Sequence, residues 1–549
     1  MSRVYYEDFP VLPTVKDLIL DGFDRGGEKR QFLFHDAAGK EREKRFCDVK
    51  ADTLALGAYL RKKGLVPGER IAIAMGNCYE WNAAFYALAV GGWTAVPLDA
   101  NLPAEELADE LRRGGCAAVF HDEARREKIE AARGAGLPAL RLAFDMARAG
   151  EYYAEGAAAA DEETALLNVP AAPEDLLAIV YTSGTTGPAK GVMLTHKNVC
   201  ADVYALLHIS TGGHGIGFLP LNHTYSWVTG LFATLVKSEW GYICTDLRKL
   251  YRDISAYKPY QFAAVPLAVE MIYQNILHTA RRNGAEEKLR RAIETSRNFM
   301  LSGYDARREM FADIHEKLGG NLETVFCGGA HLDPGIEEFM FDIGIQVRTG
   351  YGLTECAPVV ACQRQWEYKF GSVGLPLECC EVRIHEPDAH GIGEIRVRGD
   401  NVSPGYYGDP AATAEAFEDG WFKTGDLGYL DEEGYLFFTG RKKNLIVLSN
   451  GENVSPEQLE TRLAARIPYI KEALVRERDG RLTAELYPDP EEAPDAKDRI
   501  AEDLKAFNAD LPAYLRLANV TLRDTPFEKT ATMKIKRSFS LGAQYVLQQ

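Results

Sequence analysis

The chain has 549 residues, of which 46% are hydrophobic and 26% are charged, and its formal net charge is −17. That length exceeds what one hydrophobic core usually organises, so at least two domains are expected, and the composition argues against a disordered or membrane-spanning chain. The excess of acid repels nucleic-acid phosphates and anionic lipid. We therefore expect no nucleic-acid partner, and any anionic ligand has to be held by a local arrangement of groups.

Three further features limit the class of protein. The ten cysteines have no CxxC pair or zinc-like spacing, which predicts reduced and mostly buried thiols. The opening MSRVYYEDFP lacks a basic region followed by an apolar one, so we expect a cytoplasmic protein without a signal peptide. Residues 81–98 and 203–236 carry no Asp, Glu, Lys or Arg, but glycines and prolines interrupt both, and three histidines lie in the second. These stretches therefore predict buried core and no transmembrane segment.

From residue 48 to about 350, short apolar runs alternate with helix-like stretches, which predicts an α/β fold with parallel-type sheets covered by helices. The clearest unit is a helix capped by Asp48, with Leu56, Tyr59 and Leu60 on its apolar face, followed by a strand over residues 70–75. Further strands are expected at residues 117–120, 176–181, 262–265, 324–327 and 345–348. Residues 156–173 are Ala-rich and acidic, and predict a surface connector.

The pattern changes twice in the last third of the chain. After about residue 378 apolar residues alternate strictly with charged ones, as at Cys380, Val382 and Ile384, which predicts a small antiparallel or barrel-like region. Beyond Arg441, a helix beginning near Pro456 and strands near residues 473–475 and 482–486 indicate a compact α+β unit. We predict one domain over residues 1–440, with the barrel-like part at about 378–440, and a second domain over residues 441–549.

The most informative segment is residues 177–195, LAIVYTSGTTGPAKGVMLT, in which an apolar strand runs into a loop of Gly, Ser and Thr with one lysine. Glycines let a backbone approach oxygen atoms closely, hydroxyls donate hydrogen bonds and lysine supplies positive charge, so this composition suits phosphate. The residues concerned are Thr182, Ser183, Gly184, Thr185, Thr186, Gly187 and Lys190. The spacing differs from the Walker A motif, which disfavours a P-loop NTPase. A solvated polar loop is the plain alternative, but such a loop does not need two glycines, several hydroxyls and a lysine directly after a buried strand.

This segment resembles the YTSGTTGxPKG signature of the adenylate-forming superfamily, which includes acyl-CoA synthetases, luciferases and peptide-synthetase adenylation domains. Ala189 stands where the family often has proline. Five further segments follow in the family's order along the chain: PLNHTYSW from residue 220, CGGAHLD from 327, TGYGLTE from 349, GWFKTGDLGYLDEEGYLFFTGRKK from 420 and KTATMKIKR from 529. On these motifs the chain is identified as a member of the superfamily.

The resemblance implies a site for ATP. Tyr351, followed by Gly352, would stack on adenine, with Gly328, Gly329 and Ala330 as the opposite wall. An aromatic face packs on a purine and a carboxylate accepts hydroxyl protons, so Asp426 would take the ribose hydroxyls. The resemblance further implies a magnesium ion near Glu355 and Thr185, since a cation between ATP phosphates needs carboxylate oxygen. By the same resemblance, Thr354 would touch the phosphate, and Arg441 would contact ribose or phosphate at the domain junction.

The resemblance also implies a catalytic lysine and a moving domain. Lys534 matches the lysine that bridges carboxylate and phosphate in the first step, although Met533 precedes it where many members have glycine. Lys443 aligns with the hinge about which the small C-terminal domain swings. After that swing the loop at residues 450–453 would help to form the thioester.

The expected activity is that of an acid-thiol ligase, which joins a carboxylic acid to AMP with release of pyrophosphate and passes the acyl group to coenzyme A. The segment from residue 420 and RKKNLIVLSNGENVSP after it resemble fatty acid ligases of the long-chain bacterial type, so a fatty acid is the first choice. Residues 203–236 could line an acyl tunnel with His223 or Trp227 near its mouth, although core packing explains the same residues.

Three alternatives stay open from the sequence: an aryl or short-chain acid:CoA ligase, an enzyme that loads an acyl carrier protein, and a nucleotide-binding regulator without catalysis. Lys534, Glu355 and Asp426 argue against the last.

Overall fold

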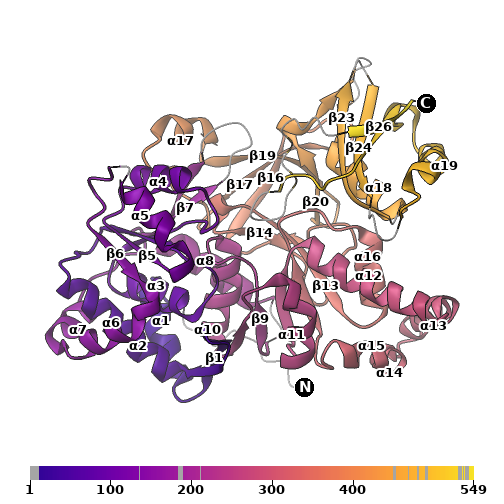
Figure 1. The fold of residues 1–549 in the computed structure, drawn as a ribbon. Coiled ribbons are helices and arrows are strands. Elements are labelled where there is room, and N and C mark those ends of the chain that lie inside the picture. Colours follow the sequence, from indigo (N-terminus) through magenta and orange to yellow (C-terminus); the bar gives the residue numbers. More distant parts are fainter. Residues whose placement is uncertain are drawn as a thin grey trace.

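The computed structural model describes residues 11–134, 136–182, 189–209, 212–448, 453–467, 469–478, 481–488, 493–529, 535, 537 and 543–548. Two large sheets with their helices and a smaller antiparallel sheet form the body of the molecule, and a small C-terminal domain lies beside them (Figure 1). The predicted α/β fold class is confirmed.

The first sheet has six strands, parallel except where β8 runs antiparallel to β7. Their order is β6 (Leu142–Asp145), β5 (Ala118–His121), β3 (Arg70–Ala74), β4 (Thr94–Pro97), β7 (Leu176–Thr182) and β8 (Lys190–Thr195). Because β7 and β8 pair Thr182 with Lys190, the predicted phosphate loop connects two neighbouring strands at this edge of the sheet.

The second sheet has nine strands, and the run from β13 through β12, β11, β9 and β10 to β1 is parallel. The order is β15 (Leu375–Pro376), β14 (Val359–Cys362), β13 (Gln346–Gly352), β12 (Thr324–Cys327), β11 (Gln261–Ala264), β9 (Gly215–Gly217), β10 (Gly241–Ile243), β1 (Arg30–His35) and β2 (Glu41–Arg45). Strands predicted at residues 262–265, 324–327 and 345–348 are β11, β12 and β13, so the parallel core of this sheet follows the apolar runs of the sequence.

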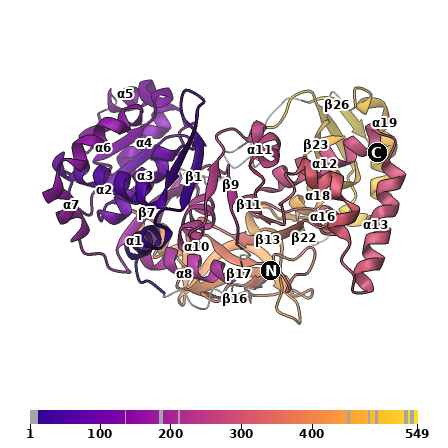
Figure 2. The same cartoon turned by 90° about the horizontal axis from the view of Figure 1, so that it is seen from below.

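The helices cover these sheets on several sides (Figure 2). They are α1 (Val15–Gly26), α2 (Phe46–Lys62), α3 (Tyr79–Val90), α4 (Ala104–Arg113), α5 (Arg126–Gly134), α6 (Ala149–Ala157), α7 (Ala160–Leu167), α8 (His196–Leu207), α9 (Thr224–Ser226), α10 (Ala233–Lys237), α11 (Leu250–Tyr257), α12 (Pro266–Arg282), α13 (Glu286–Leu301), α14 (Arg307–Met310), α15 (Ala312–Lys317), α16 (Pro334–Asp342) and α17 (Pro410–Ala416).

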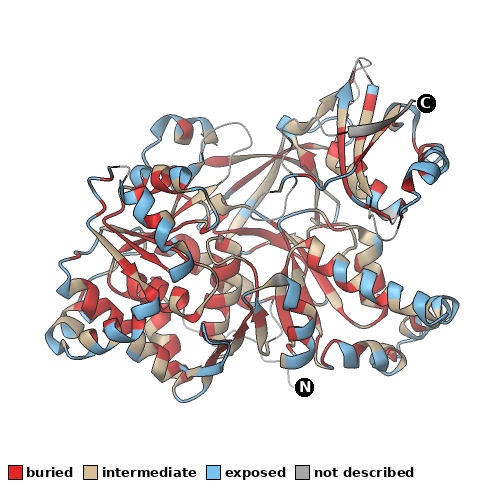
Figure 3. Ribbon diagram, viewed as in Figure 1, coloured by how far each residue is buried: buried red, intermediate tan, exposed pale blue. Residues whose placement is uncertain are grey.

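The first uncharged stretch lies in the core, as predicted, and about half of the described residues of the second stretch are buried. Residues 81–98 supply most of α3 and all of β4, and Trp81 and Trp93 are fully buried. In the second stretch Trp227 begins a π-helix (Trp227–Phe232) and packs against Phe85, with ring centroids 5.1 Å apart. No helix in the part of the chain that the structure describes is both long and apolar enough to span a membrane. Figure 3 shows the buried residues along the sheets and the inner helix faces.

Two local predictions were wrong. Asp48 is the third residue of α2 and not its cap, because the helix already begins at Phe46 and the Asp48 carboxylate accepts a hydrogen bond from the Arg45 backbone N–H at 3.0 Å. The expected connector at residues 156–173 contains a helix, α7, which packs on α2. Its Leu166 is fully buried and fills the space beside Gly57, and Glu162 pairs with Arg61 of α2 at 3.0 Å, so contacts between distant segments hold a helix that the sequence pattern did not reveal.

The predicted antiparallel region is a five-stranded sheet in which every pairing is antiparallel. It comprises β16 (Cys380–His385), β17 (Gly393–Gly399), β19 (Trp421–Leu430), β18 (Phe417–Glu418) and β20 (Leu436–Arg441), which pairs with β19. The last strand ends at Arg441, where the chain leaves for the C-terminal domain.

The C-terminal domain has its own apolar cluster, to which two helices and three strands of a four-stranded sheet contribute. Its elements are β21 (Ile446–Val447), β22 (Asn453–Val454), α18 (Pro456–Arg466), β23 (Ile470–Arg478), β24 (Arg481–Pro488), α19 (Ala496–Ala509), β25 (Asn519–Arg523) and β26 (Ala543–Gln548). The helix α18 contacts β20, so the domain packs next to the antiparallel sheet (Figure 1).

Candidate active site

Tyr351 and Asp426 come from different sheets and meet in the interior. Tyr351 lies near the end of β13, and its hydroxyl donates a hydrogen bond to Asp426 Oδ2 at 2.8 Å. Burial, and then the Asp426 carboxylate, raise the pKa of Tyr351 well above its usual value, so the phenol stays protonated and remains a donor. The structure thus joins the predicted adenine-stacking residue to the predicted ribose-binding residue.

Arg441 completes this group from the hairpin of β19 and β20. It is the cross-strand partner of Asp426, and its Nε atom lies 3.1 Å from Asp426 Oδ1. Since Asp426 is buried and Arg441 is partly exposed, the guanidinium neutralises an otherwise costly buried carboxylate.

Gly352 allows β13 and β14 to come very close together. A Cβ atom at this position would lie 2.1 Å from the Pro358 carbonyl oxygen, which no side chain tolerates. The next residue, Leu353, donates its backbone N–H to the same carbonyl at 2.8 Å. This close approach starts the one-turn 3₁₀ helix Thr354–Cys356, which carries Thr354 and Glu355.

Glu355 is linked to the phosphate-loop lysine by a residue that the sequence analysis missed, Tyr406. The Tyr406 hydroxyl donates to Glu355 Oε1 at 3.0 Å, and the Nζ atom of Lys190 lies 4.8 Å from the centre of the Tyr406 ring. Burial raises the pKa of Glu355, whereas hydrogen bonds from its own backbone and from Tyr406, and then the charge of Arg441, oppose that rise. Tyr406 belongs to SPGYYGDP, outside the motifs that carried the resemblance, so only its aromatic, glycine-flanked context gave a signal.

The two ends of the phosphate loop are described. Thr182 Oγ1 lies 3.4 Å from the Lys190 carbonyl oxygen, across the β7–β8 pair. On the other side Arg113 of α4 donates to the Ala189 carbonyl, and its guanidinium lies 4.9 Å from the Tyr181 ring centre. The predicted residues between these ends fall outside the described ranges: Ser183, Gly184, Thr185, Thr186 and Gly187.

The predicted adenine wall follows β12. Gly328 donates its N–H to the Ala264 carbonyl at 3.0 Å, and a Cβ at Gly328 would lie 3.6 Å from the Gly350 carbonyl, next to β13. Gly329 has φ +87°, a left-handed conformation that favours glycine, and Gly329 and Ala330 are exposed. The wall therefore turns outward directly beside the strand that carries Tyr351.

His223 lies two residues before a tyrosine that packs at this wall. It precedes the short helix α9, and its backbone N–H donates to the Pro220 carbonyl at 3.1 Å. Two residues later, the ring of Tyr225 lies against Gly328 and its hydroxyl donates to the Phe326 carbonyl at 3.0 Å. The structure therefore places Tyr225 at the wall, and the role predicted for His223 stays a prediction.

The predicted hinge residue Lys443 lies close enough to Arg441, Asp426 and Lys190 for their charges to affect its pKa. Lys443 is in the one-turn helix Lys442–Asn444 that follows β20. Desolvation, and then the neighbouring cations Arg441 and Lys190, lower the pKa of Lys443. Positive charge from the phosphate loop and from the interdomain segment thus converges on one region.

The catalytic candidate Lys534 lies outside the described residues, but residues on either side of it are placed. Lys529 and Ile535 form an antiparallel bridge, and Lys529 Nζ lies 2.6 Å from Glu472 Oε1. Arg537 pairs with Glu460 of α18 at 2.6 Å. These contacts attach both flanks of the lysine segment to the C-terminal domain.

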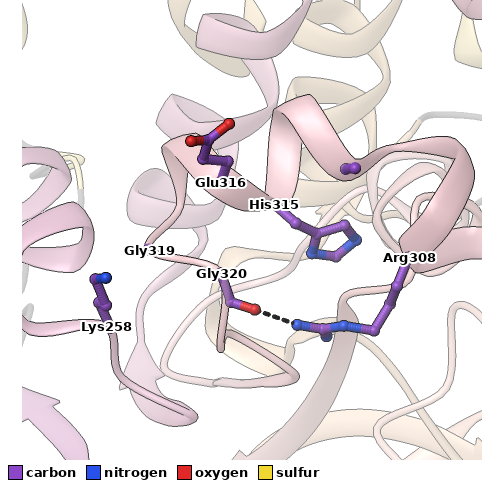
Figure 4. A pocket seen from close by; sticks show the side chains of 7 residues that line it. Lys258, Arg308, His315, Glu316, Gly319 and Gly320 are labelled. Carbon is purple, nitrogen blue, oxygen red and sulfur yellow. Dashed lines mark hydrogen bonds between the residues drawn. The ribbon is translucent and has the colours of Figure 1, made fainter.

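A surface pocket of about 370 Å³ lies elsewhere and contains none of the predicted residues (Figure 4). Arg308, His315 and Glu316 contribute side chains to it, and Arg308 donates to the Gly320 carbonyl at 2.6 Å. Because its lining comes from α14, α15 and the turns that follow α11 and α15, this pocket is separate from the candidate site.

Two family models match the chain. The family model described as AMP-binding enzyme matches residues 25–407, and the one described as AMP-binding enzyme C-terminal domain matches residues 443–544. The chain therefore belongs to the AMP-binding enzymes.

Two relatives illustrate its place among them. The long-chain-fatty-acid–CoA ligase FadD15 of Mycobacterium bovis is 31% identical over 435 residues, which cover 75% of this chain and 71% of that protein. The long-chain-fatty-acid–CoA ligase 5 of Rattus norvegicus is 28% identical over 547 residues, covering 88% and 80%.

Solved structures show the same fold. The ATP-bound MatB from Rhodopseudomonas palustris has a TM-score of 0.74 at 23% identity, covering 95% of this chain and 97% of that one. The anthranilate CoA ligase AuaEII in complex with anthranoyl-AMP has a TM-score of 0.76 at 21% identity, with 98% of each chain covered. At these identities the likeness concerns the fold alone.

Proposed function

We propose that the chain is an AMP-forming acyl-CoA synthetase that activates a long-chain fatty acid with ATP and transfers the acyl group to coenzyme A. The observation that carries this proposal is that Tyr351 is hydrogen-bonded to Asp426, and Glu355 is linked to Lys190 through Tyr406, in a member of the AMP-binding enzymes. The names of the relatives quoted above supply the substrate class.

In the first half-reaction, a carboxylate oxygen of the acid forms a bond to the α-phosphorus of ATP, the bond to the bridging oxygen breaks, and pyrophosphate leaves with that electron pair. Charge moves among phosphate oxygens, so cations have to be in place beforehand. Lys190 lies over the Tyr406 ring and Arg441 pairs with Asp426, so both supply positive charge at the candidate site. We assign to Lys534 the role of bridging the substrate carboxylate and the phosphate.

Nucleotide recognition would use the buried pair. The ring of Tyr351 would face the adenine, opposite residues 328–330. Asp426 already accepts from the Tyr351 hydroxyl and pairs with Arg441, and a carboxylate has further acceptor capacity for ribose hydroxyls.

Glu355 fits a magnesium ion. Mg²⁺ that binds together with substrate phosphates takes only one or two carboxylates from the protein, and when bound it would neutralise phosphate charge. Glu355 is a carboxylate with Tyr406 as a donor on one oxygen, an arrangement that orients a ligand. We also assign Thr185 to this site by the resemblance.

In the second half-reaction the thiolate sulfur of coenzyme A forms a bond to the acyl carbon. The bond from that carbon to the oxygen shared with AMP breaks, and AMP leaves with this oxygen and the electron pair. We propose that the domain boundary lies at residues 440–441 and that the C-terminal domain turns about Lys443 between the two steps. A carrier protein in place of coenzyme A is the alternative acceptor.

We further propose a cytoplasmic location, which fractionation of cells would test.

The test is a panel of acids from acetate to palmitate, with benzoate. Acid-dependent pyrophosphate release, and its response to coenzyme A and to a carrier protein, should be measured for each. We expect the long-chain acids to give the highest kcat/KM and the thioester to form on coenzyme A. A preference for benzoate or acetate would show that the substrate is an aryl or short-chain acid instead. If no acid gave pyrophosphate, the proposed function would be wrong.

A further inference from the structure

Tyr406 reaches the site because residues 403–407 run alongside β8. The Met193 N–H donates to the Gly405 carbonyl at 3.0 Å, and the Tyr407 N–H donates to the Gly191 carbonyl at 2.8 Å. Val192 and Tyr406 form an antiparallel bridge between these bonds. The position of Tyr406 is therefore tied to the strand that begins with Lys190.

The same segment is also tied to Glu355 and to α8. The Ser403 N–H donates to the Glu355 carbonyl at 2.8 Å, and the Ser403 hydroxyl donates to the Met193 carbonyl at 2.7 Å. From α8, the Asn198 side-chain amide donates to the Asp400 and Val402 carbonyls at 2.8 and 2.9 Å. Hydrogen bonds thus fix the Tyr406 backbone relative to both groups that its side chain touches.

The Tyr406 side chain has two different functional contacts. It is 8% exposed, and its hydroxyl is within hydrogen-bond distance of Glu355 while its ring lies under the Lys190 ammonium. A hydrogen bond to one carboxylate oxygen fixes the direction of the other oxygen, and an aromatic face attracts a cation. A residue that only filled the core would need neither contact.

We propose that Tyr406 is a positioning residue for adenylation, whose hydroxyl orients the Glu355 carboxylate and whose ring holds Lys190 at the mouth of the phosphate loop until a triphosphate takes it. This inference rests on the proposed function. It assigns two separable tasks to one side chain, so variants that remove one task at a time can test it.

Tyr406→Phe removes the hydroxyl and keeps the ring. Mutating a residue that hydrogen-bonds to a metal ligand typically weakens metal binding by about 10-fold or more. We therefore expect the Mg²⁺ concentration for half-maximal pyrophosphate release to rise about 10-fold. The kcat at saturating Mg²⁺ should stay within about 2-fold of wild type. Tyr406→Leu also removes the ring, and should in addition weaken ATP binding measured without Mg²⁺ by about 3-fold. Lys190→Met should then weaken that binding less in the Tyr406→Leu background than in wild type.

Tyr407→Phe is the matched control, because Tyr407 is the next residue and its ring lies 5.8 Å from the Arg70 guanidinium instead of the site. It should behave as wild type. A Tyr406→Phe enzyme with an unchanged Mg²⁺ dependence, or with a uniform loss of kcat and of melting temperature, would overturn the inference.

Calorimetric binding of ATP with and without Mg²⁺ separates this result from the proposed function. If wild type releases no pyrophosphate with any acid, the proposed function fails, yet a loss of Mg²⁺-dependent ATP binding in Tyr406→Phe still supports the role of Tyr406. If wild type binds ATP equally with and without Mg²⁺, the inference about Tyr406 fails. If wild type is active and Tyr406→Phe matches it in both assays, only the inference about Tyr406 fails.

Discussion

Arg441 and Asp426 are paired across the hairpin of β19 and β20, with Arg441 Nε 3.1 Å from Asp426 Oδ1. Arg441 ends the last strand of the antiparallel sheet, and the predicted hinge residue Lys443 follows two positions later. The carboxylate assigned to ribose is therefore in contact with the segment that leads to the C-terminal domain. Under the proposed function, this pair would connect nucleotide binding at Asp426 to the segment that leads to the C-terminal domain.

Asp426→Asn tests the role of the carboxylate. The substitution keeps the shape but removes the charge that pairs with Arg441 and would accept the ribose hydroxyls. Because hydrogen bonds to charged groups contribute about 1.5–3 kcal/mol, we expect ATP to bind about 10- to 100-fold more weakly by calorimetry. Asp431→Asn is a suitable control, because Asp431 lies at the turn of the same hairpin and pairs with Lys369. Unchanged ATP affinity in Asp426→Asn would refute the assignment.

Gly352→Ala tests whether the close approach of β13 and β14 builds the site. The added methyl group would meet the Pro358 carbonyl at 2.1 Å, so the strands have to separate and displace Thr354 and Glu355. We expect a loss of stability of more than about 2 kcal/mol, seen as a lower melting temperature, together with a large loss of pyrophosphate release. Gly134→Ala is the matched control, since nothing lies within 4 Å of a Cβ at Gly134. Wild-type melting and activity in Gly352→Ala would contradict the prediction.

The buried carboxyl of Glu110 gives a prediction about pH. Glu110 lies on α4 with 7% exposure, and desolvation raises its pKa from 4.5 to about 7 against the opposing effect of Arg113. The folded state holds this proton more tightly than the unfolded chain, so the stability contribution is fully present below pH 4.5 and is lost as pH rises towards 7. The total loss is about 3 kcal/mol.

Glu110→Gln removes this titration. We expect the variant to exceed wild type in unfolding free energy by up to about 3 kcal/mol at pH 8, and by less than about 1 kcal/mol at pH 5, in denaturant melts. Glu106→Gln, an exposed site on the same helix, should change neither value. An equal effect of Glu110→Gln at both pH values would show that the carboxyl is not the titrating group.

Much of the fold could be predicted from the sequence because apolar runs and alternation directly reflect burial. The strand at residues 324–327 has the same limits in the structure, and the alternation at Cys380, Val382 and Ile384 is β16. In contrast, α7 is held by contacts between distant segments, such as Leu166 beside Gly57, and these leave no periodic pattern.

In the candidate site, too, some residues could be predicted from the sequence and others could not. Tyr351 and Asp426 were predicted from motifs, and the structure joins them by a hydrogen bond. Tyr406 was missed, because its importance arises from two neighbours that are far away in sequence, Lys190 and Glu355. A single sequence has no means to show that one tyrosine touches both.

Lys534→Ala tests the two-step cycle. Loss of one preorganised charge typically reduces a rate by about 100-fold or more, so we expect adenylate formation from acid and ATP to fall by about that factor, while thioester formation from supplied acyl-adenylate stays largely intact. Rapid-quench measurement of each half-reaction separates the two. Lys505→Ala, at an exposed position on α19, controls for loss of a cation from the same domain and should leave both rates unchanged. An equal loss of both half-reactions in Lys534→Ala would contradict a domain that carries this lysine away after the first step, because a fixed lysine would serve both steps from one position.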